Sequence, residues 1–457
     1  MTGAVAEETV WSSSGDETSN SPVRILQQLI RFDTTNPPGH EEACIRYIEG
    51  LLQDAGIPSA ILAKESGRPN LIARLPGSGE APPLLLYGHV DVVDTTKQEW
   101  SRDPFGGELE DGYIWGRGTL DMKGGIAMML AAFIRAHQEA VPLKGDIILA
   151  IVSDEEAGGD LGAGYLVEQF PHLFEGVNYA IGEFGGFTFQ SGGRTFYPVM
   201  VAEKGLCWLK ATIRGDGGHG SLGHRDGCMA QLGDMLQWLN RVKLPVHVTP
   251  AASLMIHAMA DALPAASGFL LRQLLRPGWT GAVLKLLGDK GKLFQSLLYN
   301  TISATIVRGG EKINVHPSEI EVQLDGRLVP GFTPEQFIEE LYQSGLSRKI
   351  KLELLLHDPI PAAPDMGLFP LLSEVLKAAD RDAIPVPMLL PGGTDGRHFD
   401  KLGIQTYGYL PMPLPEQLNF TSLIHAADER VPAESILFGA EALYRVLARY
   451  GETDLRK

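Results

Sequence analysis

Two histidines and five carboxylic acids lie at positions where ligand-binding side chains are expected. They are His89, Asp91, Asp121, Glu155, Glu156, Glu183 and His425. A lone histidine near a strand end is usually structural, and an aspartate before a helix usually caps that helix. The informative feature is that most of these residues follow an apolar segment closely. We therefore expect them to meet at one place and to act together.

The apolar segments are typical of buried parallel strands. Residues 84–87, 147–152 and 179–181 are continuous apolar runs, and candidate residues follow soon after each of them. Residues 124–137 are typical of a buried helix, and Asp121 lies just before it. Strands that alternate with helices predict an α/β fold, a mostly parallel sheet flanked by helices. Such sheets bind ligands beyond the carboxyl ends of their strands.

Imidazoles and carboxylates gathered at one edge repel one another unless cations lie between them. A pair of divalent cations removes this repulsion, and mixed histidine and carboxylate ligands favour zinc, with cobalt or manganese as substitutes. Two metals about 3.5–4 Å apart need one bridging carboxylate and further ligands on each side. Asp121 is the natural bridge. His89 and Glu183 complete one metal, and Glu156 and His425 complete the other.

The two remaining acids have different predicted roles. Asp91 lies two residues after His89, on the same face of the strand, and is expected to accept the imidazole N–H. Glu155 is adjacent to a ligand but is not needed as one. It is the candidate general base, which takes the proton of a water whose pKa the metals lower to about 7.

A second kind of domain interrupts the first. Beyond residue 200 the pattern predicts an α+β sandwich. Its expected strands are 205–214, 301–307, 320–324 and 349–356, and its expected amphipathic helices are 228–242 and 333–343. The α/β pattern returns after residue 358, with a strand at 405–410. The predicted organisation is a flexible leader at 1–20, a metal-binding catalytic domain at 21–200 and 358–457, and an inserted lid at 201–357. A long apolar, helix-prone insertion at 251–298 lies within the lid.

Composition excludes several classes of protein. The 457 residues carry a net charge of −17, which argues against a nucleic-acid-binding protein. No apolar run reaches the roughly 18 residues that a membrane span requires. The three cysteines form neither a metal-binding pattern nor a disulfide framework, and the polar leader does not resemble a secretory signal. These features predict a cytoplasmic protein with free thiols.

The candidate residues lie in sequence blocks that resemble family 20 of the metallopeptidases. The blocks, which follow the family's order, are 85–93, 116–125, 154–156, 391–397, and His425 with Glu429-Arg430. That family includes aminoacylases, acetylornithine deacetylase, succinyl-diaminopimelate desuccinylase and glutamate-releasing carboxypeptidases. The resemblance implies the metal ligands and base assigned above and an inserted lid domain. The insertion at 251–298 resembles the longer carboxypeptidase and N-acyl amino acid hydrolase branch.

The resemblance also implies residues that contact substrate. His219, in Gly218-His219-Gly220-Ser221, resembles a lid histidine that stabilises the tetrahedral oxyanion, often from the partner subunit of a homodimer. Asn314 matches a substrate-binding asparagine, and Arg327 matches an arginine that faces a substrate carboxylate. Gly393 and Thr394 line the substrate cleft with their backbone. The sequence departs from the family pattern at Gly223, where the family usually has a proline before the histidine that corresponds to His224.

These observations predict a two-zinc amidohydrolase that cleaves N-acyl amino acids or short peptides. Deacylase and peptidase activity both remain open. The insertion at 251–298 is expected to provide extra lid packing or a dimer surface rather than a substrate contact. The alternatives are a non-catalytic binding protein that retains the fold and a peripheral membrane protein that uses the helices of the insertion. The intact set of ligands and base argues against the first alternative.

Overall fold

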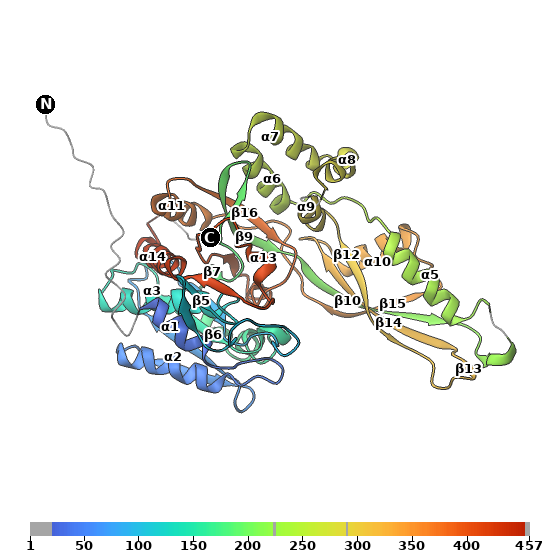
Figure 1. The fold of residues 1–457 in the computed structure, drawn as a ribbon, viewed down its shortest axis with the longest axis horizontal. Coiled ribbons are helices and arrows are strands. Elements are labelled where there is room, and N and C mark those ends of the chain that lie inside the picture. Colours follow the sequence, from blue (N-terminus) through green and yellow to red (C-terminus); the bar gives the residue numbers. More distant parts are fainter. Residues whose placement is uncertain (1–20, 223–224, 289–290, 453–457) are drawn as a thin grey trace. The chain divides into compact units, whose positions relative to one another are not determined.

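The computed structural model describes residues 21–222, 225–288 and 291–452 (Figure 1). The chain divides into two compact units. The first contains the described residues of 1–81, 86–162 and 410–454, and the second contains those of 82–85 and 163–409. The predicted leader and the Gly223–His224 pair lie outside the described residues. The predicted boundaries of the catalytic domain and lid stay predictions.

In the main sheet of the first unit the strands follow the order β1-β2-β6-β3, and helices pack beside them. Its larger elements are α1 (Pro22–Ile30), α2 (Glu42–Asp54), β1 (Ser59–Ala63), β2 (Pro69–Leu75), β3 (Leu84–His89), α3 (Lys123–Gln138), β6 (Ile147–Val152), α13 (Phe420–Leu423) and α14 (Ala433–Arg449). Helix α3 is buried along most of its length, between α1 and α14. Strand β3 extends through His89 rather than ending at Gly88, so this histidine is the last residue of the strand.

A small antiparallel sheet brings two distant segments of the first unit together. It consists of β4 (Glu108–Glu110), β5 (Tyr113–Trp115) and β18 (Arg430–Pro432). In the register of this sheet Trp115 is paired with Arg430. The loop that leads from β5 to Asp121 therefore lies beside the loop that leads from His425 to β18. The sequence did not predict this sheet because its strands are only three residues long.

The second unit continues the α/β pattern. Its strands follow the order β7-β17-β9-β16, with β8 paired to β9. The elements are α4 (Ala163–Gln169), β7 (Tyr179–Gly182), β8 (Phe189–Ser191), β9 (Arg194–Glu203), α11 (Phe369–Ala379), β16 (Ala383–Leu390), α12 (Gly396–Asp400) and β17 (Gln405–Gly408). Strands β7 and β17 are parallel, and so are β9 and β16. In the first unit, by contrast, β1 pairs with β2 and β2 pairs with β6 in antiparallel orientation.

Residues 205–357 form the predicted α+β arrangement. A four-stranded antiparallel sheet has the order β12-β14-β10-β15. Its elements are β10 (Gly205–Arg214), α5 (Cys228–Arg241), β12 (Thr301–Arg308), β14 (Glu319–Leu328), α10 (Pro334–Gln343) and β15 (Lys351–His357), and a two-stranded ladder joins β11 (Gly218–His219) to β13 (Val315–His316). Apolar residues of the sheet and both helices share one core. The predicted fold class, a mostly parallel sheet with helices and an inserted α+β part, is confirmed.

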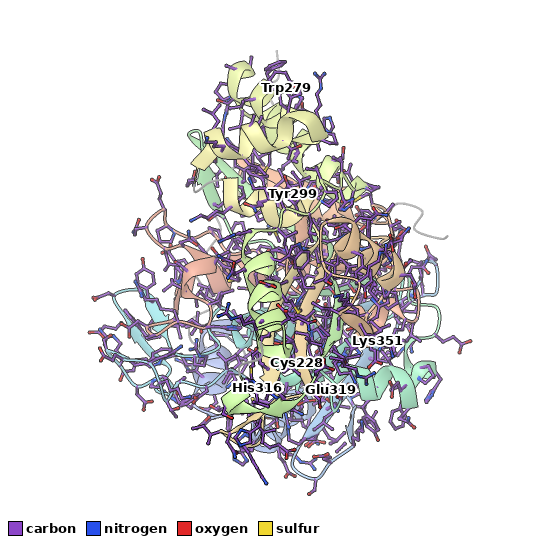
Figure 2. All side chains as sticks on the ribbon, turned by 90° about the vertical axis from the view of Figure 1, so that its right-hand side faces the viewer. Cys228, Trp279, Tyr299, His316, Glu319 and Lys351 are labelled. Atoms are coloured by element: carbon purple, nitrogen blue, oxygen red, sulfur yellow. The ribbon has the colours of Figure 1, made fainter. Side chains whose placement is uncertain are left out.

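The apolar insertion folds into four helices, α6 (Pro250–Ala262), α7 (Ala265–Arg272), α8 (Pro277–Leu287) and α9 (Gly291–Leu298). Buried side chains such as Met255 and Ile256 of α6 share a core with Val386 and Leu389 of β16. The insertion thus covers part of the α/β sheet. Figure 2 labels Trp279 of α8 and Tyr299, the residue that follows α9.

Two further sequence-based expectations concern thiols and membrane spans. The thiols of Cys44, Cys207 and Cys228 are free, as predicted, and all three residues are buried. Among the described residues, no helix has the length and apolarity needed to cross a membrane. The cytoplasmic location stays a prediction.

Candidate metal centre

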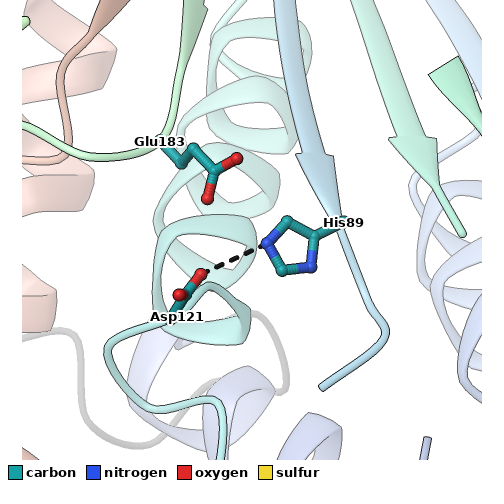
Figure 3. Close-up of side chains that lie close together, drawn as sticks. All are labelled: His89, Asp121 and Glu183. Atoms are coloured by element: carbon teal, nitrogen blue, oxygen red, sulfur yellow. Dashed lines mark hydrogen bonds and ion pairs between the residues drawn. The ribbon is translucent and has the colours of Figure 1, made fainter. Parts of the chain in front are cut away.

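Asp121 lies between two imidazoles in the first unit. Its Oδ1 atom is 3.2 Å from Nε2 of His89, and its Oδ2 atom is 3.1 Å from Nε2 of His425 (the first contact is drawn in Figure 3). Each carboxylate oxygen therefore faces a different histidine, which is the arrangement that a bridging ligand requires. Asp121 also belongs to a candidate metal-binding group with Glu156 and His425. Glu183 directly follows β7 in the second unit, and its assignment as a ligand stays a prediction.

The Glu155–Glu156 turn directly follows the end of β6. Glu155 and Glu156 belong to one candidate group with His89. The Oε1 atom of Glu156 also lies 3.5 Å from Nε2 of His425. The two acids are therefore beside the Asp121 cluster, with Glu156 close to the histidine to which the sequence assigned it.

Asp91 holds both the histidine and this turn. Its backbone carbonyl accepts a 3.0 Å hydrogen bond from Nδ1 of His89, which leaves the Nε2 lone pair toward Asp121 in the neutral ring. Its carboxylate accepts the backbone N–H groups of Glu155 and Glu156 at 3.1 and 3.0 Å. Asp91 thus contacts both the His89 ring and the backbone of the two glutamates, and its orienting role stays a prediction.

The charges of the cluster favour bound cations. The hydrogen bonds that His425 donates to the carboxylates of Asp121 and Glu156 raise its pKa to about 10. Burial raises the pKa of Glu156, and the neighbouring charge of Asp121 adds to this effect. A metal ligand must be a neutral imidazole, so divalent cations would displace the His425 proton and replace its hydrogen bonds with coordination bonds. The donor set of histidine nitrogens and carboxylate oxygens therefore fits the predicted metals.

A buried ion pair fixes the loop that carries Asp121. Arg117 donates to Oε2 of Glu429 at 2.5 Å, and Oε1 of Glu429 accepts the backbone N–H groups of Gly118 and Leu120 at 3.1 and 2.8 Å. Both side chains are almost fully buried. Gln98 accepts from Arg117 and donates to the backbone carbonyl of His425. Glu429, Arg117 and Gln98 thus connect the loop of Asp121 to the loop of His425 through hydrogen bonds.

Replacing Glu429 with alanine should destabilise the protein by about 3–5 kcal/mol, because it leaves the buried Arg117 guanidinium without its anion. Glu441→Ala is the matched control, since Glu441 pairs with Arg135 at the surface. The control should cost less than about 1 kcal/mol. Urea denaturation of both metal-free variants measures the difference. Equal stabilities would show that the buried pair does not support this loop.

A second hydrogen-bond network, which the sequence analysis missed, holds Asp154, the residue before the Glu155–Glu156 turn. Arg68 donates to both carboxylate oxygens of Glu41 at 2.6 and 2.7 Å, and its Nη2 atom also lies 3.1 Å from Asp154. Asn36 donates to both Asp91 and Asp154. Asp154 has a positive φ of 75°, so these contacts hold a strained residue beside Glu155. Glu41 and Arg68 lie outside the matched blocks, which explains why no signal identified them.

The lid residues His219 and Asn314 come from neighbouring segments of the second unit. His219 pairs with Val315 in the β11–β13 ladder, and the N–H of Gly220 donates to the backbone carbonyl of Asn314 at 2.8 Å. The His219 side chain is exposed, and its Nδ1 atom lies 2.8 Å from the hydroxyl of Ser221. The two predicted substrate-contacting residues are therefore adjacent, on one exposed loop pair.

Arg327, Gly393 and Thr394 form a second group within the same unit. Arg327 belongs to β14, and a Cβ placed on Gly393 would lie 3.9 Å from its Nη1 atom. The backbone N–H of Thr394 donates to the buried carboxylate of Glu203 at 2.8 Å. This contact anchors the loop between β16 and α12 at the end of β9.

Comparison with known proteins identifies the family to which this chain is similar. Residues 85–449 match the family described as Peptidase family M20/M25/M40. A probable carboxypeptidase S-like 2 of Dictyostelium discoideum is 26% identical over 76% of this chain and 68% of its own length. The N-fatty-acyl-amino acid synthase/hydrolase PM20D1 of Xenopus tropicalis is 26% identical over 78% of this chain and 70% of its own length.

The fold also matches a solved structure over nearly its whole length. The M20 family metallo-carboxypeptidase Sso-CP2 of Sulfolobus solfataricus superposes with a TM-score of 0.67 at 20% identity, over 94% of this chain and 99% of that one. The predicted family resemblance and the predicted enzyme class, a hydrolase of amide or peptide bonds, are confirmed. The chain belongs to the peptidase family M20/M25/M40.

Proposed function

We propose that this protein is a two-metal amidohydrolase that cleaves the amide bond of N-acyl amino acids or short peptides. The observation that carries the proposal is the position of Asp121, whose two carboxylate oxygens face the Nε2 atoms of His89 and His425. A histidine at each oxygen fits this role, because each metal of a pair needs a further ligand beside the shared carboxylate.

The metal ligands are His89, Asp121, Glu156, Glu183 and His425, with zinc as the favoured metal and cobalt or manganese as substitutes. When bound, such metals polarise the substrate carbonyl and lower the pKa of water. Glu155 takes the proton of the attacking water and delivers it to the leaving nitrogen. Asp91 is a positioning residue, because it holds the His89 ring and the backbone of the Glu155–Glu156 turn.

The remaining assigned residues bind the substrate. His219 and Asn314 donate hydrogen bonds to the oxyanion and to the substrate, Arg327 binds a carboxylate, and Gly393 and Thr394 line the cleft with their backbone. Relatives named as a carboxypeptidase and as an N-fatty-acyl amino acid hydrolase support substrates with a free carboxylate and an apolar group. A non-catalytic binding protein is the alternative.

A substrate screen tests the proposal. Purified protein loaded with zinc, cobalt or manganese is incubated with N-acyl amino acids of increasing chain length and with dipeptides, and the released amines are measured. We expect metal-dependent release from at least one class. Binding of these compounds without any release, at every metal, would favour the non-catalytic alternative.

His219→Ala is expected to lower kcat about 10²–10³-fold, the typical cost of losing one oxyanion donor. Metal content should not change, because His219 is not among the candidate ligands. The matched control is His257→Ala, which removes an exposed histidine from α6. Similar kcat values for the two variants would show that His219 does not contact the reacting group.

If the protein is a homodimer whose lid contributes His219 to the active site of the partner subunit, two inactive variants should complement each other. Mixing Glu155→Gln protein with His219→Ala protein should restore part of the activity, because one site of the mixed dimer then has both residues. Failure to restore activity after subunit exchange has been demonstrated would place His219 in its own chain's site or outside catalysis.

A further inference from the structure

We propose that the exposed face of α8, the third helix of the apolar insertion, binds the surface of an anionic phospholipid bilayer. This interaction goes beyond the proposed hydrolysis and does not depend on it. Three features of the insertion support it. Large apolar side chains lie on a solvent-exposed face of α8, basic residues lie beside them, and the charge of the insertion is opposite to that of the whole chain.

Helix α8 is already attached to the protein by one apolar face. Thr280 and Val283 are buried, and Leu284 and Leu287 pack against the core that the insertion shares with β16. These four residues are spaced at i, i+3, i+4 and i+7, so they lie on one side of the helix. A surface helix of this kind normally presents polar side chains on its opposite side.

The opposite side of α8 presents a second apolar stripe instead. Trp279 is 61% exposed and Leu286 is 71% exposed, and the exposed Ala282 lies between them. Their spacing of three and four residues places them on one face. Figure 2 shows Trp279 at the outer end of the helical segment. Phe269 of α7 is also 65% exposed. Exposed apolar side chains gathered in this way indicate a surface that meets an apolar partner.

The charges beside the stripe favour an anionic partner. Lys285 precedes Leu286 on the exposed side, and the exposed Arg276 directly precedes the helix. The sequence from 276 to 287 contains no acidic residue. Residues 251–298 contain five basic and two acidic residues, a net charge of +3 in a chain whose net charge is −17. An anionic surface would therefore attract the insertion and repel the rest of the chain, which favours one orientation.

An anionic bilayer matches both features of this face. Its head groups attract lysine and arginine, tryptophan is typical of the head-group level, and leucine reaches the boundary of the acyl chains. With 11 residues, α8 is too short to span the bilayer and would lie in the plane of the surface. A twofold contact between the α8 faces of two copies would instead bring the same basic residues together. The bilayer is therefore the better partner.

Co-sedimentation of the full-length protein with lipid vesicles tests the proposal. One set of vesicles contains phosphatidylcholine alone, and the other contains equal amounts of phosphatidylcholine and phosphatidylserine. We expect binding to the mixed vesicles, weaker binding to phosphatidylcholine alone, and a decrease in binding as the salt concentration rises, because salt screens exposed charges.

Four variants locate the binding face. Leu286→Ser and Trp279→Ser should each weaken binding to the mixed vesicles about 10–100-fold, because less apolar surface is buried. Leu355→Ser, which removes a 49% exposed leucine from β15, should have no effect. Lys285→Glu should weaken binding about 10–30-fold, since each charge near an anionic surface contributes roughly fivefold. Its matched control is Lys377→Glu, which reverses the charge of an exposed lysine in α11. Circular dichroism checks the folding of every variant, including the control with serine in β15.

Several results would overturn the proposal. They are no binding of the parent protein to mixed vesicles at low salt, equal binding to both kinds of vesicle, and unchanged binding in either Leu286→Ser or Trp279→Ser. Sedimentation equilibrium without lipid tests the other occupant. A dimer that Leu286→Ser dissociates, together with absent vesicle binding, would assign this face to a second copy of the chain. Because no substrate is present, none of these outcomes depends on hydrolysis.

Discussion

Glu155→Gln is expected to lower kcat about 10²–10⁴-fold while the protein keeps its metals, because a positioned general base contributes a factor of this size. The amide is isosteric with the acid, and Asp91 holds this residue through the backbone N–H rather than the side chain. The turn should therefore keep its shape. Steady-state kinetics and metal analysis of the same preparation measure the two effects.

Glu156→Gln is the control for this prediction. It changes the next residue, whose backbone N–H is also held by Asp91. Because the Glu156 carboxylate lies beside His425, we expect this variant to lose affinity for one metal. Metal loss in Glu155→Gln together with full metal content in Glu156→Gln would mean that the ligand and the base are exchanged.

Removal of the metals should abolish hydrolysis and leave the fold largely intact. The candidate ligands lie at strand ends and in loops, whereas the apolar cores of the chain contain other residues. The contacts of Glu429 with Arg117 and of Asp91 with the Glu155–Glu156 turn also need no cation. Chelation, followed by amide hydrolysis assays and circular dichroism, tests both halves of this prediction.

Two results would contradict it. Full activity at a metal content near zero would refute the two-metal assignment, whereas loss of secondary structure on chelation would show that the metals support the fold. Restoration of activity by zinc, cobalt or manganese separates reversible metal loss from damage by the chelator. The order of the three metals in this assay also identifies the one that suits the site.

Several elements could be predicted because short-range patterns were unambiguous. The apolar runs at 84–87, 147–152 and 179–181 all lie within observed strands, and the ligand candidates follow them as expected. By contrast, β9 and β16 were missed because Pro198, Pro385 and Pro387 interrupt their patterns. Proline is unfavourable in a strand interior. The pairing of these strands, and the helices of the insertion that cover them, are tertiary effects.

The sequence by itself determined the family and the fold class, and it proposed the candidate metal ligands, because strand ends and residue types are local properties. The tertiary structure alone decided that Asp121 presents one oxygen to each histidine and that Glu429 fixes its loop. These contacts join residues far apart in the chain. Their geometry depends on packing, which no local pattern encodes.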